Sequence, residues 1–118
     1  MIERTSVIQG IQPGRYTLQV LNRPEKKKTA KSSYRVWDLG IVEDKVVTSK
    51  FKVFMFPWES EGLLLALGGK KDGNDIVWDD EEVTGKQIDA DVKQVEYEKD
   101  GEKRNKYVIE NCAEAIPF

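Results

Sequence analysis

Apolar and polar residues alternate along five stretches of the chain. This is the pattern of half-buried β-strands, because successive side chains of a strand point to opposite faces. The predicted strands cover residues 15–21, 34–42, 46–56, a stretch that begins at Gly85, and residues 106–115. Turn signals separate several of them: Pro13-Gly14, Glu43-Asp44 and Asp100-Gly101.

A short helix is predicted between the third and fourth strands. Pro57 ends the third strand, and Ser60 can cap the first turn of the helix. Gly68-Gly69 offers a C-terminal stop. The apolar residues at helical spacing share one side: Leu63, Leu64 and Leu67.

Two segments carry no regular pattern. Arg23–Ser33, which is polar and contains Pro24, is predicted to be a loop. The acidic stretch after the helix is predicted to be irregular and anchored to the core by three residues: Ile76, Val77 and Trp78. The OB-fold has the same order of elements: a strand, a long loop, two strands, a helix and a final hairpin. We therefore expect a mainly β protein, folded as one five-stranded OB-fold barrel over residues 1–118, with a short helix between strands three and four.

The third predicted strand has two unlike faces. One face is apolar and suits a core: Phe51, Val53 and Met55. The other combines two cations with two aromatic rings: Lys50, Lys52, Phe54 and Phe56. Cations hold phosphates and flat rings stack on bases, so the second face is typical of a single-strand nucleic-acid platform. The alternative is a strand buried on both faces.

The charges are segregated, although the net charge is only −2. Residues 4–56 hold eleven Lys/Arg against four acids, whereas residues 57–118 hold eight against sixteen. The basic residues concentrate in residues 23–35. This asymmetry predicts one side that faces a polyanion and an acidic far side. Taken alone, the lysine cluster also fits a solvated loop.

An OB-fold binds nucleic acid on strands two and three, between the loop that joins strands one and two and the loop that joins strands four and five. The cations and rings at these places form the predicted interface: Lys26, Lys27, Lys28, Lys31, Tyr34, Arg35, Trp37, Lys50, Lys52, Phe54, Phe56, Trp58, Tyr97, Lys103, Arg104 and Lys106. Trp37 has a second interpretation, because it shares its strand frame with Leu39 and Ile41 and would then lie in the core.

Four motifs resemble the small phage and prophage OB-fold proteins that bind single-stranded DNA. They are Pro13-Gly14-Arg15-Tyr16-Thr17, Trp37-Asp38-Leu39-Gly40-Ile41-Val42, Glu82-Val83-Thr84-Gly85-Lys86 and Asp100-Gly101-Glu102-Lys103-Arg104-Asn105. The resemblance implies a non-catalytic protein that binds single-stranded DNA with little sequence preference during replication or recombination. The runner-up is a protein–protein adaptor on the same fold. Pairing of barrels into a homo-oligomer through strand edges is compatible with either function.

The chain ends in Ile116-Pro117-Phe118, which is similar to the end of bacterial SSB proteins. In that family the terminal Phe ring and its carboxylate dock on partner replication and repair proteins. The resemblance implies the same partner-binding role for these three residues. This chain lacks the preceding run of Asp residues and the long linker, and the alternative is that Ile116 and Phe118 complete the fifth strand.

Catalytic readings find little support. The chain has no His, and its lone Cys112 excludes an internal disulfide and a thiolate metal site. Asp91-Val92-Lys93, preceded by Asp79 or Asp80, matches the acid-x-lysine pattern of Mg²⁺-dependent nucleases, a distant third function. The acids between Asp72 and Asp80 depart from the EF-hand spacing for Ca²⁺. We expect no cofactor, no membrane span and a cytoplasmic protein, since the N-terminal residues lack the layout of a secretion signal.

Overall fold

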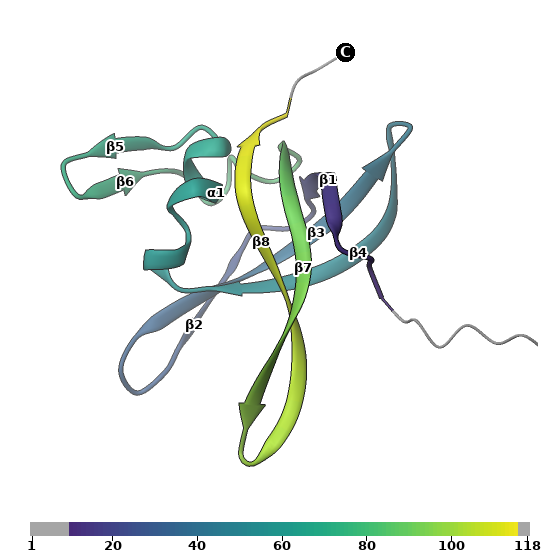
Figure 1. Ribbon diagram of the computed structural model, residues 1–118. Coiled ribbons are helices and arrows are strands. Elements are labelled where there is room, and N and C mark those ends of the chain that lie inside the picture. Colours follow the sequence, from purple (N-terminus) through teal and green to yellow (C-terminus); the bar gives the residue numbers. More distant parts are fainter. Residues whose placement is uncertain (1–9, 116–118) are drawn as a thin grey trace, which may run out of the picture.

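A computed structural model describes residues 10–115, which form a mainly β protein (Figure 1). The one α-helix of this part is α1 (Glu61–Ala66), and a 3₁₀ turn, η1 (Pro57–Glu59), precedes it. The described residues form eight strands, more than the five predicted: β1 (Gly14–Val20), β2 (Glu25–Lys28), β3 (Ser33–Glu43), β4 (Val46–Met55), β5 (Lys70–Asp72), β6 (Asp75–Val77), β7 (Gln87–Lys99) and β8 (Glu102–Glu114).

Six strands form one antiparallel sheet in the order β2-β3-β1-β7-β8, with β4 on the other edge of β3. β3 pairs with β2 along Ser33–Val36 and with β1 along Leu39–Val42, so β1 and β2 share one edge of β3. β4 and β8 approach each other, and the ring centroids of Phe51 and Tyr107 lie 5.3 Å apart. No ladder joins these two strands within the described residues, so the predicted closed barrel is not found there.

The five strands predicted from alternation are present, each within a few residues of its expected bounds apart from the last. β8 begins at Glu102, four residues before the predicted start, because the hairpin ladder continues to the turn at Asp100-Gly101. That turn has positive φ at both residues (54° and 79°), the conformation of the type I′ turn that Asp-Gly favours.

Two segments expected to be irregular contain strands instead. Within the predicted loop Arg23–Ser33, β2 pairs with the start of β3. Its sequence, Glu-Lys-Lys-Lys, shows no alternation because all four side chains are exposed, so only the backbone hydrogen bonds make it a strand. The acidic stretch likewise contains the separate β5–β6 hairpin.

The core lies between the sheet and α1, and it follows the predicted frames. Buried side chains come from the strands and the helix: Leu18, Val20, Trp37, Leu39, Ile41, Phe51, Val53, Met55, Leu63, Leu64, Leu67, Ile88, Ala90, Val92 and Ile109. Ile76 and Trp78 pack against this core as predicted. Val77 does not, because it points the other way on β6 and is 62% exposed.

Gly68-Gly69 ends α1, as the sequence predicts. The Gly68 N–H donates to the carbonyl of Leu65 at 3.1 Å, and the Gly69 N–H donates to that of Leu64 at 2.8 Å. These are the two hydrogen bonds of a Schellman motif, and the positive φ of Gly68 (98°) is the left-handed conformation that such a stop requires. The chain therefore turns back sharply into β5.

Two hairpins extend from the body toward the same side of the molecule, the lower side in Figure 1. One is the β2–β3 hairpin, and the other is the longer β7–β8 hairpin. These are the two connections that were expected to flank a nucleic-acid strand. The end of β4 and η1 lie beside the β2–β3 hairpin, because β4 pairs with β3 as far as Arg35.

Candidate nucleic-acid interface

Four aromatic side chains form a row on the surface, here called the aromatic strip: Phe54, Tyr34, Phe56 and Trp58. The ring of Tyr34 lies 6.2 Å from that of Phe54 and 5.7 Å from that of Phe56, measured between centroids. Phe56 and Trp58 stack at 4.5 Å with only 7° between their planes. Phe54 is 47% exposed and Trp58 70% exposed, so the row presents ring surface to solvent.

Strand register brings these rings together. Phe54 lies opposite Val36 on the β3–β4 ladder, so Tyr34, two residues earlier on β3, is its diagonal neighbour on the same face. Pro57 then ends β4 and opens η1. The Phe56 N–H donates to the Glu59 carboxylate at 3.0 Å, which holds this turn and places Trp58 against Phe56.

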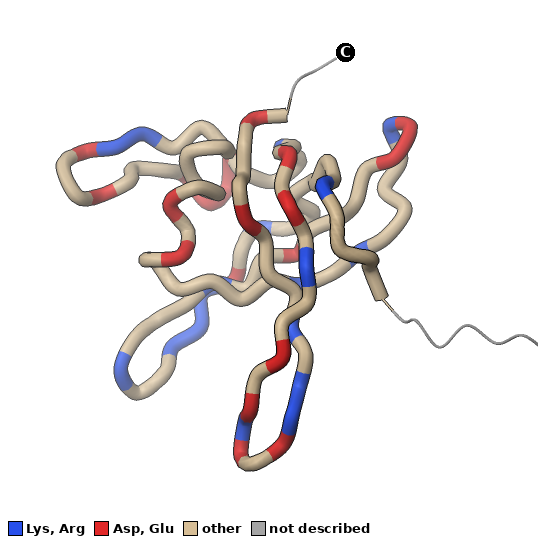
Figure 2. The backbone as a smooth tube through the Cα atoms, viewed as in Figure 1, with Lys and Arg blue, Asp and Glu red and all other residues tan. Residues whose placement is uncertain are grey.

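Lysines adjoin the strip on both sides, and Figure 2 shows them concentrated on the β2–β3 hairpin. Lys27 lies opposite Tyr34, but its ammonium pairs with Glu25 at 2.8 Å, and that hydrogen bond raises its pKa. Lys52 on β4 pairs with Asp38 at 3.4 Å. Four other cations of the predicted interface form no ion pair with any described residue: Lys26, Lys28, Lys31 and Lys50. Lys26 and Lys28 alternate with Lys27 along β2, so they lie on the face of the hairpin opposite the one that Lys27 shares with Tyr34.

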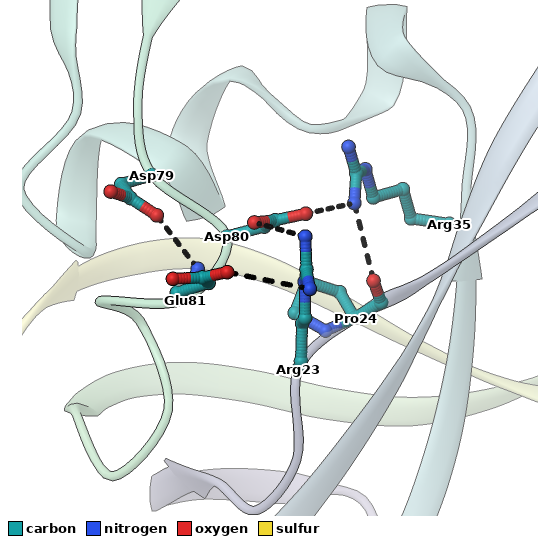
Figure 3. Close-up of polar contacts among 6 residues, drawn as sticks. All are labelled: Arg23, Pro24, Arg35, Asp79, Asp80 and Glu81. Carbon is teal, nitrogen blue, oxygen red and sulfur yellow. Dashed lines mark hydrogen bonds and ion pairs between the residues drawn. The ribbon is translucent and has the colours of Figure 1, made fainter.

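Arg35 has a different role from the predicted one, as Figure 3 shows. Its guanidinium donates to the Asp80 carboxylate at 3.1 Å and to the Pro24 carbonyl at 3.2 Å. Arg23 also pairs with Asp80, at 3.2 Å, and with Glu81 at 3.5 Å. Arg35 points to the core side of β3, so this ion-pair cluster ties the base of the β2–β3 hairpin to the loop after β6.

We expect the ion-pair cluster to stabilise the fold only above acidic pH. The hydrogen bond from Arg23, followed by that from Arg35, holds the pKa of Asp80 below its ordinary value of 3.8. A carboxyl with a lowered folded-state pKa contributes stability above its unfolded pKa and loses it as pH falls through the folded value. Asp80→Asn should therefore lower the melting temperature at pH 7, with the difference from wild type shrinking below about pH 4. Thermal melts of both proteins from pH 7 to pH 3 test this, and a constant difference would contradict it.

The prediction that Trp37 stacks on bases is wrong. Its side chain is 1% exposed, because Trp37 shares the inward frame of β3 with Leu39 and Ile41. The Trp37 ring stacks on the Trp78 ring, with 5.6 Å between their centroids. The guanidinium carbon of Arg35 lies 4.9 Å from the centroid of the Trp78 ring. Trp37 therefore belongs to the core, as its alternative interpretation held.

The β7–β8 hairpin divides its predicted residues between two faces. Tyr97 lies opposite Arg104, and the Lys106 ammonium sits 5.7 Å from the Tyr97 ring centroid. Lys103 alternates to the other face and pairs with Glu96 at 3.6 Å, while Arg104 pairs with Glu102 at 3.2 Å. Positive and negative residues therefore alternate along this hairpin (Figure 2), unlike the first one. Tyr97 and Lys106 form a small second group, on a hairpin separate from the strip.

The nuclease-like acids are engaged in hydrogen bonds and ion pairs. Asp91 accepts from Asn111 at 2.8 Å and from Arg15 at 3.2 Å, and these contacts lower its pKa. Lys93 pairs with Glu110 at 2.9 Å. Among residues 10–115, no three His, Cys, Asp or Glu side chains gather as a metal site would require, and no helix is long and apolar enough to span a membrane. The predicted docking residues Ile116, Pro117 and Phe118 lie outside the described residues.

Comparisons of the chain with protein-family models, curated proteins and solved structures find no match. The functional proposal therefore rests on the chemistry of the site. That site combines exposed rings in mutual contact with unpaired lysines, three on the β2–β3 hairpin and one, Lys50, on β4. The Arg23–Asp80–Arg35 ion pairs anchor the base of the hairpin.

Proposed function

We propose that this protein binds single-stranded DNA, with little sequence preference, along the aromatic strip. One observation carries the proposal: four rings lie in contact in a row, and two of them are about half or more exposed. Clustered exposed apolar surface marks interaction sites. Flat rings accept unpaired bases, and adjacent cations accept the phosphates that join them. The unpaired lysines of the β2–β3 hairpin and of β4 favour a polyanion over an uncharged protein partner.

We also propose that the sheet is an open variant of the OB-fold barrel. β1, β3, β4, β7 and β8 correspond to its five strands, and the Phe51–Tyr107 contact takes the place of the closing ladder. An OB-fold is often only partly closed, and it binds nucleic acid on its second and third strands. In this chain those strands are β3 and β4, which carry Tyr34 and Phe54. The motifs that resemble phage single-stranded-DNA-binding proteins support the same assignment and suggest a role in replication or recombination.

Tryptophan fluorescence during titration with oligo-dT tests the function, because Trp58 lies on the strip and Trp37 in the core. We expect quenching on binding and a steep loss of affinity with salt. Four phosphate contacts in single-stranded DNA give a log–log slope of about −3, so affinity should fall about 50-fold between 50 and 200 mM salt. Trp58→Phe should keep most of the affinity, since a phenyl ring still stacks, and lose the part of the quenching that Trp58 contributes.

Charge variants supply the control for this titration. Lys28→Ala with Lys31→Ala should reduce the salt slope by about 1.4, because each removes one phosphate contact. Lys45→Asn removes a charge at the far end of β4, and asparagine tolerates the φ of 66° at that turn, so the slope should not change. Absence of quenching and of salt dependence would contradict the proposal and favour the adaptor function. The same titration with oligo-rU measures the preference between DNA and RNA.

A further inference from the structure

A cavity of about 610 Å³ lies beside the strip, between the β2–β3 hairpin, the η1–α1 segment and the β5–β6 hairpin. Its volume falls within the roughly 300–1,000 Å³ of small-molecule sites. Tyr34 and Trp58 line it and also belong to the strip, so the cavity opens directly from the proposed path of the DNA. No function assigned so far uses it.

The lining suits a flat, neutral group with hydrogen-bonding edges. Trp78 contributes an indole that is held in place by stacking on Trp37 at 5.6 Å and by Arg35 at 4.9 Å. Ser33 and Asn74 add a hydroxyl and an amide. Aromatic faces with a few polar groups that set orientation are typical of ligand sites.

The charges around the cavity exclude phosphate from its interior. Glu61 and Asp75 line it, and Lys71 is already paired with Glu61 at 2.6 Å. Arg35 is held by Asp80. Lys26 is the lining cation that no described residue pairs with, and it comes from the exposed β2 strand. A phosphate is therefore expected at Lys26, on the exposed hairpin, while the group that enters is uncharged.

Trp37 adds an unpaired donor in the wall of the cavity. It lines the cavity, and its indole nitrogen is the one buried side-chain polar atom in residues 10–115 that has no hydrogen-bond partner. Buried donors are nearly always paired, because an unpaired one loses its hydration without compensation. The nitrogen has almost no accessible surface, so a nucleobase carbonyl in the cavity could accept from it only after neighbouring side chains shift.

We propose that this cavity receives one nucleobase of the bound strand, turned out of the stack along the aromatic strip, with the adjoining phosphate at Lys26. The proposal rests on the proposed function and deepens it, since it adds a fixed register to otherwise sequence-tolerant binding. Trp58 lies at the junction: one base stacks with the strip, and the next enters between Trp58 and Trp78.

An abasic scan tests the register. The shortest oligo-dT that binds with full affinity is synthesised with a single abasic residue at each position in turn, and each affinity is measured by competition against labelled oligo-dT. At one position, the loss of affinity should be roughly ten times larger than at the neighbouring positions, because the base at that position contacts several walls of the cavity at once. An equal loss at every position, with oligo-dT still bound, would overturn the cavity proposal and leave the proposed function standing. Failure of unmodified oligo-dT to bind would overturn both.

Two tryptophan substitutions on the same short hairpin separate the cavity from the rest of the surface. Asn74→Trp places an indole at a residue that lines the cavity, and it should abolish the position-dependent loss while oligo-dT still binds. Asp72→Trp, at the exposed end of β5 next to the turn that contains Asn74 but outside the lining, should leave the scan unchanged. Retention of the position dependence in Asn74→Trp would overturn the proposal. Thermal melts confirm that each variant is folded. If Asn74→Trp does not fold, the abasic scan of the wild-type protein decides whether a base enters the cavity.

Discussion

Replacing Phe54 and Phe56 together by alanine is expected to lower the affinity for oligo-dT roughly 30-fold or more. Each stacked base is worth about 1–3 kcal/mol, and about 1.4 kcal/mol is a factor of ten in affinity. Both rings contact Tyr34, so their removal interrupts the strip at two adjoining positions. Competition titration at one fixed salt concentration measures the loss, and the salt slope should stay unchanged because no cation is removed.

The control for this variant lies on the same strand. Val46 is even more exposed than Phe54, at 60% against 47%, but sits at the opposite end of β4, and Val46→Ala should leave the affinity unchanged. The double variant should also keep its fold, since Phe54 is half exposed and Phe56 lies outside the buried core. A loss of binding that simply follows a loss of folded protein in urea would refute the stacking role. Phe54→Tyr with Phe56→Tyr should restore binding, because a phenol ring stacks as well.

Strands with one solvent-exposed face could be predicted from the sequence because burial alternates along them. On β7, Ile88, Ala90 and Val92 are buried while their neighbours are not, so the period of two is visible in the sequence itself. The same reasoning separated the two faces of β4. It put Phe51 in the core and Phe54 on the surface, and both placements are confirmed.

Strands with two wet faces could not be predicted in this way. β2 exposes all four of its side chains and is a strand only because its backbone pairs with β3. The β5–β6 hairpin has three residues in each strand, too few to establish a period. Closure of the sheet is likewise a property of backbone pairing between β4 and β8, which are far apart in the sequence, and no local pattern reports it.

At the site, the rings were easier to predict than the charges. Strand alternation identifies which rings face outward, so Phe54 was placed on the surface correctly without knowledge of the fold. The state of a cation depends instead on what lies opposite it in space. The partner of Arg35 is Asp80, 45 residues away in sequence, and the acidic stretch gave no local sign that it reaches this hairpin. The cavity was missed for the same reason, because three separate segments enclose it.

The second large effect concerns stability, and it separates two tryptophans. Trp37→Ala is expected to lower the free energy of unfolding by about 3–5 kcal/mol, the usual cost of truncating a large buried ring. Trp37 is among the largest fully buried side chains and supports Trp78 by stacking. Most small domains are stable by only about 5–15 kcal/mol, so this variant should be marginally folded. Urea denaturation followed by circular dichroism measures the change.

Trp58→Ala is the matched comparison, since it removes the same side chain from a site that is 70% exposed. Its unfolding free energy should change by no more than about 0.5 kcal/mol, whereas its affinity for oligo-dT should fall roughly 5-fold or more with the loss of one stacking surface. Trp37→Phe should retain more stability than Trp37→Ala, because it keeps a ring in the core and also removes the unpaired indole N–H. The opposite pattern, with Trp58 governing stability and Trp37 only binding, would mean that β3 presents its other face to the core. The frame shared by Trp37, Leu39 and Ile41 ties the two measurements together, because one strand cannot turn a single residue of that set outward without turning the others.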